Sequence, residues 1–361
     1  MSLSQTLSRT AMSDDPSGFK LQFASDNTAG ICPEALDAFN AANAGFAASY
    51  GNDEATRRVC DKLRQLFDAD AEVFFVFNGT AANSVALASL CQSYQAVVCS
   101  DTAHVETDEC GAPEFFSNGS KLLVSPHQLG KLTSSGVLEA ITRRSDIHYP
   151  RPKVVTLTQA TELGTVYQTG EVTDIARIAH DHGLSVHMDG ARFANAVATL
   201  GCTPADISWR AGVDVLCFGG TKMGLPVGEA IIFFDRKRGE EFAYRCKQAG
   251  QLASKMRFLS APWLAMLDAD TWLRHAAHAN AKAKQLAQRI AAIPGAKMLL
   301  PCEANGVFVN LPESAIERLR AQGWIFYTFI GGGARFMCSW ATSAAAIDAL
   351  ADDIEQSINA A

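Results

Sequence analysis

The sequence contains no long apolar run, no closely paired cysteines and no block of like charge. No apolar stretch approaches the roughly 18 residues that a membrane-spanning helix needs, so a membrane protein is not expected. The ten cysteines are scattered without a CxxC pair, which disfavours a zinc site or a disulfide framework and favours reduced thiols in the cytoplasm. The net charge of −7 is spread along the chain, so neither nucleic acid nor an anionic membrane surface is an expected partner.

The length and composition favour a globular protein that acts on a small molecule. The 361 residues are 48% hydrophobic, enough for one large domain and a smaller one. Residues 1–22 are Ser-rich and lack the apolar core of a secretory signal, so we expect a flexible N-terminal lead there. We expect the large domain over residues 23–260 and the small C-terminal domain over residues 261–361.

Short apolar runs alternate with helical patterns through the first two thirds of the chain. The runs are residues 72–77, 96–99, 153–157, 184–188, 213–218 and 229–234. This rhythm predicts an α/β protein with a mainly parallel sheet. The runs are continuously apolar rather than alternating, which indicates that helices cover both faces of the sheet. Beyond residue 235, long helical segments lead into a second, smaller α/β unit.

Polar residues that follow the predicted strands are the first candidates for a site, because ligands of open parallel sheets collect at the carboxyl ends of the strands. Asn78, Gly79 and Thr80 follow one run and open a predicted helix, whose N-terminus can hold a phosphate. Asp189 and Arg192 follow another run. Each feature alone is also typical of ordinary structure, either a capped helix or an acid neutralised by a base.

Lys222 changes this interpretation, because it follows a third strand-like run and has glycines on both sides. An amine in such a place can form a Schiff base with an aldehyde. A phosphate turn, a carboxylate and a lysine, each after a strand and in this order, are what a pyridoxal 5′-phosphate site requires. The carboxylate would keep the pyridine nitrogen protonated.

A series of motifs in the chain is similar to one known family. The motifs are Phe23-Ala-Ser-Asp-Asn27, Tyr50-Gly-Asn-Asp-Glu54, Asn78-Gly-Thr-Ala-Ala-Asn83, His104 with Asp108 to Asn118, His187-Met-Asp-Gly-Ala-Arg-Phe-Ala-Asn195, Lys222 and Arg335. In this order they resemble the L-threonine aldolase family of fold-type I pyridoxal-phosphate enzymes, especially its bacterial members close to phenylserine aldolase. The resemblance extends from about Phe23 to the C-terminus.

The resemblance implies a fold, a reaction and an assembly. The fold would be that of fold-type I enzymes, with a mainly parallel seven-stranded sheet and a smaller C-terminal α/β domain. The reaction would be retro-aldol cleavage of L-threonine, L-allo-threonine or related L-3-hydroxy-α-amino acids to glycine and an aldehyde, with a preference for phenylserine as an alternative. The assembly would be a homodimer or homotetramer in which a neighbouring subunit completes the active site, with Tyr50 and residues 244–250 at the interface.

The resemblance also implies roles for individual residues. Lys222 would hold the cofactor, Asp189 would hold the ring nitrogen, and His104 would lie over the ring. The other expected cofactor-binding residues are Asn78, Gly79, Thr80, Thr221 and Arg192. Ser25, Arg192 and Arg335 would bind the substrate carboxylate. His104 and His148, or a water that they hold, would be the base that takes the β-hydroxyl proton.

One departure and three other interpretations stay open. Residues 158–164 carry Glu162 where many threonine aldolases have an Asn-Thr-His-Asn pattern, so specificity toward the aldehyde is open. A β-elimination or transamination would use the same Lys222 and Asp189. A metal-dependent enzyme would need ligands among the histidines at 180, 182 and 187 or at 275 and 278, which form no recognised pattern, so no metal is expected. A non-catalytic binding protein is disfavoured because the lysine, the aspartate and both arginines are present.

Overall fold

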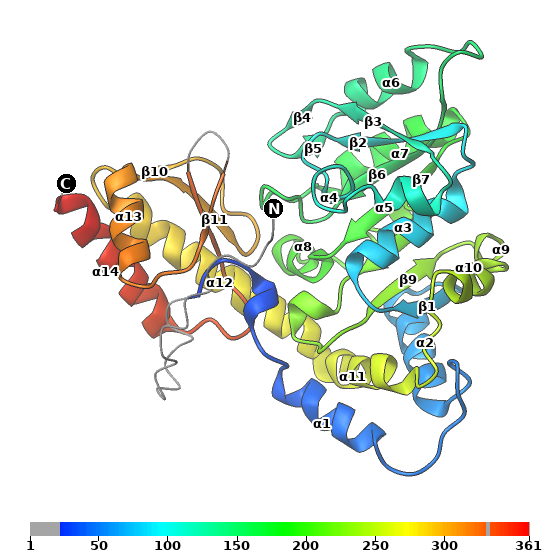
Figure 1. The fold of residues 1–361 in the computed structure, drawn as a ribbon, viewed down its shortest axis with the longest axis horizontal. Coiled ribbons are helices and arrows are strands. Elements are labelled where there is room, and N and C mark those ends of the chain that lie inside the picture. Colours follow the sequence, from blue (N-terminus) through cyan, green and yellow to red (C-terminus); the bar gives the residue numbers. More distant parts are fainter. Residues whose placement is uncertain (1–21, 330–332, 361) are drawn as a thin grey trace, which may run out of the picture.

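A computed structural model describes residues 22–329 and 333–360 of the chain, and within them two sheets organise two α/β units (Figure 1). Residues 1–21 of the predicted N-terminal lead lie outside the described part. Among the described helices, none combines the length and the apolar character needed to cross a bilayer. All ten cysteines carry free thiols.

The larger unit is built on a seven-stranded sheet with the strand order β1-β9-β8-β7-β6-β2-β3. The strands are β1 (Glu72–Val76), β2 (Gln95–Ser100), β3 (Lys121–Ser125), β6 (Arg151–Thr158), β7 (Ser185–Gly190), β8 (Val215–Phe218) and β9 (Glu229–Phe233). Neighbouring strands from β8 to β3 are parallel, whereas β9 runs antiparallel to both of its neighbours. The predicted mainly parallel α/β sheet is confirmed. The edge strand β3 was not among the predicted runs.

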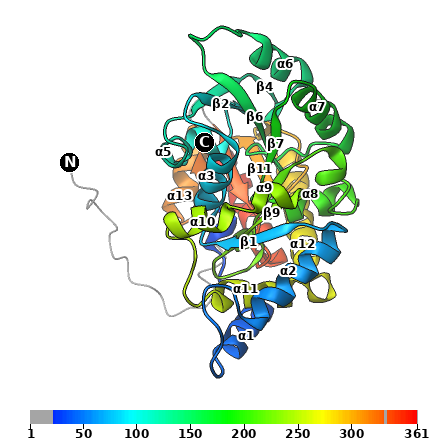
Figure 2. The same ribbon diagram turned by 90° about the vertical axis from the view of Figure 1, so that its right-hand side faces the viewer.

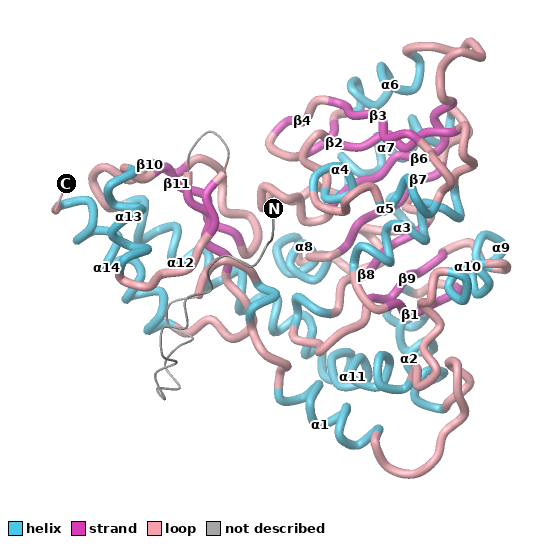
Figure 3. The backbone as a smooth tube through the Cα atoms, in the orientation of Figure 1, coloured by secondary structure: helices cyan, strands magenta, loops and turns pink. Residues whose placement is uncertain are grey.

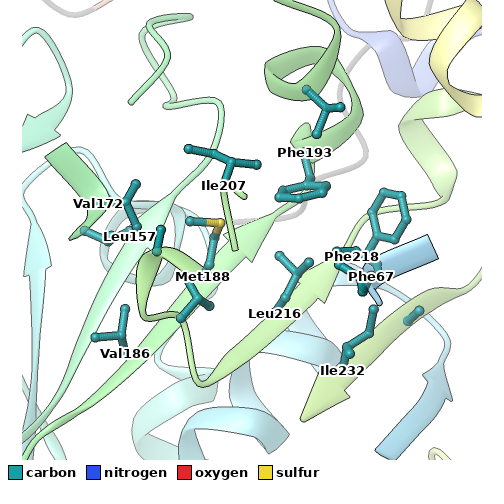
Figure 4. Close-up of a cluster of buried hydrophobic side chains, with 14 of the residues drawn as sticks. Phe67, Leu157, Val172, Val186, Met188, Phe193, Ile207, Leu216, Phe218 and Ile232 are labelled. Atoms are coloured by element: carbon teal, nitrogen blue, oxygen red, sulfur yellow. The ribbon is translucent and has the colours of Figure 1, made fainter. Parts of the chain in front are cut away.

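Helices cover both faces of this sheet, as the continuous apolar runs predicted (Figure 2). In β8, Leu216 and Phe218 join the cluster of buried side chains seen in Figure 4, whereas Val215 and Cys217 pack on the opposite face. The first face is covered by α2 (Glu54–Phe67), α7 (Thr169–Asp181), α8 (Phe193–Leu200) and α11 (Arg257–Leu267). The second face is covered by α3 (Gly79–Leu90) and α10 (Phe242–Gln248).

Local sequence signals set the ends of α7. The Glu171 carboxylate accepts the main-chain N–H of Gln168 at 2.7 Å, and the Gln168 side chain caps the first turn in return. The helix ends before Gly183, whose φ of +72° suits glycine because it has no Cβ. The remaining elements of this unit are α1 (Pro33–Ala42), α4 (His104–Thr107), α5 (Ala112–Phe116), α6 (Ser134–Thr142), α9 (Arg236–Gly239) and the hairpin of β4 (His127–Gln128) and β5 (Lys131–Leu132).

The smaller unit has a four-stranded antiparallel sheet in the order β10-β11-β13-β12 (Figure 3). Its elements are α12 (Thr271–Ala291), β10 (Lys297–Met298), β11 (Gly306–Asn310), α13 (Glu313–Ala321), β12 (Tyr327–Thr328), β13 (Ala334–Met337) and α14 (Ala344–Asn359). The helix α12 joins the two cores, because Ala276 packs in the first and Ala283 in the second. The packing therefore changes partners within α12, later in the chain than the expected boundary at residue 261.

The start of the described chain belongs to the small unit. Phe23 is buried, and its ring centroid lies 5.9 Å from that of Trp324. The next residues then lead across to the large unit, where Cys32 is part of the core. Ser25 and Asp26 thus lie where the two units meet, although we expected residue 23 to begin the large domain.

Candidate active site

The carboxyl ends of β7 and β8 open onto a cavity of about 320 Å³. Most of the predicted site residues line it: Asn78, Gly79, Thr80, His104, Asp189, Thr221 and Lys222. They come from separate stretches of the chain and meet because parallel strands end at one edge of the sheet. Their roles remain proposals, whereas their common location is a feature of the fold.

The helix α3 begins at this cavity. Asn78 is its N-cap, and the Asn78 side chain accepts the main-chain N–H of Ala81 at 2.9 Å. Gly79 and Thr80 form the first turn, at the helix end that carries a partial positive charge. The start of α3 is therefore suited to hold an anion such as a phosphate.

Lys222 lies on a short 3₁₀ turn directly after β8. A Cβ on Gly219 would lie 2.6 Å from the carbonyl oxygen of Ala191, and one on Gly220 would lie 2.5 Å from that of Gly228. The glycines therefore permit close backbone packing between strand ends, which brings Lys222 beside the end of β7. Burial and then the nearby Arg192 charge lower the pKa of the Lys222 amine. This favours the unprotonated, nucleophilic form.

Asp189 is held at the end of β7 by two hydrogen bonds. Its Oδ1 accepts the main-chain N–H of Ala191 at 2.9 Å, and its Oδ2 accepts a side-chain N–H of Asn83 at 2.9 Å. The residue is 6% exposed, and that small exposed part faces the cavity. A carboxylate fixed in this way can pair with a protonated ring nitrogen.

His104 lies at the start of α4, between two acidic side chains. Its Nδ1 is 2.8 Å from Oε1 of the buried Glu109, and its main-chain N–H donates to Oε1 of Glu162 at 2.9 Å. The hydrogen bond to Glu109 raises the pKa of His104. Burial and then the charge of Asp189 raise the pKa of Glu162 to about 7. Of these acids, the sequence marked Glu162 only as a departure and assigned Glu109 no role.

Glu229 is a further cavity residue that the sequence did not single out. It begins β9, so its only signal is an acid at the start of an apolar strand. The Thr221 hydroxyl donates to Glu229 Oε1 at 2.7 Å, and the main-chain N–H of Gly220 donates to Oε2. The expected contact between Thr221 and a phosphate stays a prediction, because in the structure this hydroxyl is bound to a carboxylate.

Arg192 has a different partner from the one we weighed in the sequence. It does not simply neutralise Asp189; its Nε and Nη2 donate to the two carboxylate oxygens of Asp26 at 2.7 and 2.9 Å. Asn305 of the small unit also donates to Asp26 at 2.9 Å. Burial is the largest single influence on Asp26 and raises its pKa, but the charges of Arg192 and Lys222 and the hydrogen bonds from Arg192 and Asn305 together lower that pKa to about 2. The position and charge of Arg192 are therefore fixed where the two units meet.

Arg335 reaches the same region from β13. Its Nη2 donates to the carbonyl oxygen of Ala24 at 3.3 Å, and its guanidinium lies 5.2 Å from the ring centroid of Tyr327. Within the described part of the chain, its buried Nε has no hydrogen-bond partner. A buried donor of this kind is costly unless an acceptor reaches it. This arginine is thus suited to an anionic ligand, and Ser25 is the residue after Ala24.

His148 lies neither at the cavity nor in the neighbouring region that holds Ser25, Arg192 and Arg335. It is exposed and lines a separate surface cavity with Tyr94 and Pro150. It precedes Arg151, the first residue of β6. We therefore correct the expectation that His148 lies beside the β-hydroxyl group. Within one chain it lies at the amino end of β6, whereas the candidate site lies at the carboxyl ends of the strands.

A different histidine, His127, lies nearer the carboxyl ends of the parallel strands. It is in β4, and its Nε2 is 3.6 Å from Oδ1 of Asp101, the residue that follows β2. In the sequence His127 follows only a short apolar run, so no local signal marks it as a site residue.

Replacing His148 by alanine is expected to leave aldehyde release unchanged. An exposed side chain away from the cavity contributes little, so the free energy of unfolding should change by less than about 0.5 kcal/mol. Steady-state kinetics and urea unfolding of the His148→Ala variant measure both quantities, with His104→Ala for contrast. A selective loss of activity in His148→Ala would return this residue to the site.

The fold and the site define a class of protein. A helix N-terminus, a fixed carboxylate and a buried lysine amine around one cavity meet the needs of pyridoxal 5′-phosphate, and the unpaired Arg335 Nε suits a substrate anion. The chain is a pyridoxal-phosphate-dependent lyase of the fold-type I class. It belongs to the beta-eliminating lyase family, whose model matches residues 22–314.

Relatives within this family are closely similar to the chain. It is 62% identical over 340 residues to the low specificity L-threonine aldolase of a Pseudomonas species, covering 94% of this chain and 98% of the relative. It is 63% identical over 334 residues to the enzyme of the same name from Pseudomonas aeruginosa, covering 92% and 96%. The solved structure of Leishmania major threonine aldolase is similar with a TM-score of 0.85 and 28% identity, covering 94% of this chain and 97% of that one.

Proposed function

We propose that the protein cleaves L-threonine, L-allo-threonine and related L-3-hydroxy-α-amino acids by a retro-aldol reaction, which yields glycine and an aldehyde. One observation carries the proposal: the buried Lys222 amine, the Asp189 carboxylate and the start of α3 line a single cavity. The names of the Pseudomonas and Leishmania relatives support the choice of reaction. Phenylserine is an alternative preferred substrate within the same reaction.

Different residues of the cavity would bind different parts of the cofactor. Pyridoxal 5′-phosphate, when bound, takes up the electron pair of a bond that breaks at the substrate Cα. Lys222 would hold its aldehyde carbon covalently, and Asp189 would keep a proton on its ring nitrogen. The start of α3 at Asn78, Gly79 and Thr80 would bind the phosphate. The side chain of His104 would lie over the ring.

The arginines would decide which bond breaks. Arg335 and Arg192, with the Ser25 hydroxyl, would bind the substrate carboxylate and turn the Cα–Cβ bond perpendicular to the ring. The ion pair with Asp26 occupies Nε and Nη2 of Arg192, so Arg335 would carry more of the contact than we expected from the sequence. A fixed carboxylate orientation favours cleavage at Cβ over removal of the Cα proton, which β-elimination or transamination would need.

The base that takes the β-hydroxyl proton would be a histidine near the carboxyl ends of the parallel strands. His104 lines the cavity, its side chain is 40% exposed, and its hydrogen bond with Glu109 raises its pKa, which makes the ring a stronger base. It would take the β-hydroxyl proton directly or through a water. His127 is the second candidate, because it lies near the same strand ends.

The decisive experiment supplies the purified protein, loaded with pyridoxal 5′-phosphate, with L-threonine, L-allo-threonine and L-phenylserine in turn. Release of acetaldehyde or benzaldehyde together with glycine is the expected result, and the ranking of kcat/KM values identifies the preferred substrate. Formation of pyruvate or another keto acid without aldehyde would point instead to elimination or transamination.

Arg335→Lys is expected to raise the KM for the amino acid with little change in kcat. Lysine keeps the charge but loses the planar pair of donors that fits a carboxylate. A hydrogen bond to a charged group is worth roughly 1.5–3 kcal/mol, so the KM should rise about ten- to hundred-fold. Steady-state kinetics with L-threonine tests this, with the Arg177→Lys variant on the exposed face of α7 as a matched control. An unaltered KM would remove Arg335 from the substrate site.

We further propose that the protein acts as a homodimer or homotetramer in the cytoplasm. Exposed aromatic side chains support an interface near residues 50 and 244, because Tyr50 is 44% and Tyr244 is 78% exposed. Lys247 lies 4.7 Å from the ring centroid of Tyr50, which joins these two stretches on one surface. Light scattering coupled to size-exclusion chromatography gives the oligomeric state, and a monomer at working concentration would contradict this proposal.

A further inference from the structure

A chain of hydrogen bonds links Asp189 to His104 through two buried polar side chains. Asn83 of α3 donates from Nδ2 to Asp189 Oδ2 at 2.9 Å and to Glu109 Oε1 at 2.8 Å. Glu109, in the turn between α4 and α5, is 2.8 Å from Nδ1 of His104 through the same Oε1 atom. Neither Asn83 nor Glu109 has a role in the function proposed above.

The chemistry of Asn83 fixes the direction of two hydrogen bonds in the chain, and an ionised Glu109 fixes the direction of the third. The amide nitrogen of Asn83 carries two N–H groups and can only donate, so Asp189 Oδ2 and Glu109 Oε1 are both acceptors. When Glu109 is ionised, its Oε1 can only accept, so the Nδ1 atom of His104 carries the proton of this hydrogen bond. The neutral ring then has its lone pair on Nε2, which is left to exchange a proton elsewhere.

Burial of the Glu109 carboxylate carries a free-energy cost. The Glu109 side chain is fully buried, whereas the ring of His104 is 40% exposed. In the described structure, the second oxygen of Glu109 is buried without a hydrogen-bond partner. A buried carboxylate with an unpaired oxygen is unfavourable, and a neutral side chain of the same size would avoid that cost. Packing alone therefore does not account for an acid at position 109.

The pKa values of both groups in the pair are raised, for different reasons. Burial raises the pKa of Glu109, which its hydrogen bond with His104 opposes, and the same hydrogen bond raises the pKa of His104. The other charged groups around His104 are Asp189 on β7, Lys222 after β8 and Glu162 after β6. Of the four, Glu109 is the one that bonds to the ring itself, so it controls the affinity of the ring for a proton most directly.

We propose that Glu109 is a positioning residue that holds His104 with its proton on Nδ1 and keeps Nε2 basic enough to take up the β-hydroxyl proton of the substrate. Asn83 fixes Glu109 and Asp189 relative to each other, so the group that would act on the substrate and the group that would hold the cofactor ring are aligned by one side chain. The catalytic role given to His104 in this inference rests on the proposed function. The tautomer and the pKa of His104 can be measured without turnover.

The test compares Glu109→Gln with Glu106→Gln, which removes one negative charge from an exposed position on α4. The first measurement is ¹⁵N NMR of the histidine side chains in the full chain without cofactor, with His104 assigned by its loss in His104→Gln. We expect the wild-type His104 to be protonated on Nδ1 in its neutral form. In Glu109→Gln its pKa should fall by about one unit or more, because a nearby carboxylate commonly shifts a partner by that amount. Glu106→Gln should leave it in place.

The second measurement is the pH profile of kcat/KM for the holoenzyme. The acidic limb, where the base becomes protonated, should move to lower pH in Glu109→Gln, and the rate at the plateau should fall because a weaker base accepts the proton less readily. The dissociation constant of pyridoxal 5′-phosphate, measured by absorbance, should stay close to that of the wild type. A merely structural loss would weaken cofactor binding without moving the acidic limb.

An unchanged His104 pKa in Glu109→Gln, or an equal shift in both glutamine variants, would overturn the proposal. So would a neutral wild-type His104 with its proton on Nε2. If Glu109→Gln does not fold, Glu109→Asp replaces it, since it keeps the charge but withdraws it from Nδ1; a wild-type pKa in that variant would also count against the proposal. If the wild type releases no aldehyde from any substrate, the proposed function fails, while the NMR comparison still decides the role of Glu109.

Discussion

Replacing Lys222 by alanine is expected to abolish both aldehyde release and the visible absorbance of the cofactor-loaded protein. The amine of Lys222 lines the cavity at the end of β8, and burial lowers its pKa, so it is prepared to bond to an aldehyde carbon. Alanine offers no nucleophile. Pyridoxal 5′-phosphate could then be held only through its phosphate and its ring nitrogen.

The measurement combines three readouts on the wild type and on Lys222→Ala: the absorption spectrum after dialysis, the rate of aldehyde release, and peptide mass mapping after borohydride reduction. In the wild type the cofactor mass should appear on the peptide that contains Lys222. Lys121→Ala, at an exposed position of the edge strand β3, serves as control and should match the wild type. A cofactor adduct on another lysine, or a spectrum unchanged in Lys222→Ala, would refute the assignment.

Replacing Asp189 by asparagine is expected to reduce kcat/KM by roughly 30- to 5,000-fold. Breaking a buried, hydrogen-bonded charge contact costs about 2–5 kcal/mol, which corresponds to this range. Asparagine keeps the size of the side chain, but its single amide oxygen can accept from Ala191 or from Asn83 and not from both. The change therefore removes the charge that would keep a proton on the ring nitrogen, and it spares most of the packing.

The fall should be mainly in kcat, because a ring without that proton accepts electrons less readily. Steady-state kinetics measure this, and the cofactor dissociation constant shows how much of the loss is binding. Asp174→Asn, at an exposed position of α7, removes the same charge far from the cavity and should leave kcat/KM unchanged. A wild-type kcat in Asp189→Asn would show that this carboxylate does not act on the cofactor.

The elements of the large unit could be predicted because their signals are local. The apolar runs at residues 72–77, 184–188 and 213–218 became β1, β7 and β8, and the helix predicted to open at residues 78–80 became α3. The edge strand β3 escaped because its apolar run covers only Leu122 to Val124, between Lys121 and Ser125, so the apolar signal is short. The place where the two cores divide could not be predicted either, since α12 is one uninterrupted helix that packs in both.

The candidate site shows the same contrast. Asp189 and Lys222 were predicted because each follows a strand, and strand ends meet at one edge whatever the details of packing. The resemblance implied a place for His148 at the site, but within one chain this residue lies away from those strand ends. A histidine near a strand in the sequence can lie at either end of it, and this one precedes β6 rather than following it.

By itself, the sequence determined the kind of chemistry: a lysine, a carboxylate and a helix start, each after a strand, together with motifs that mark the family. Only the tertiary structure decided the partners of the charged groups. Arg192 pairs with Asp26, 166 positions away, and Asn83 joins Asp189 to Glu109. The physical reason is that a buried charge is stabilised by whichever opposite charge or donor the fold brings within about 3 Å, and local sequence holds no information about that distance.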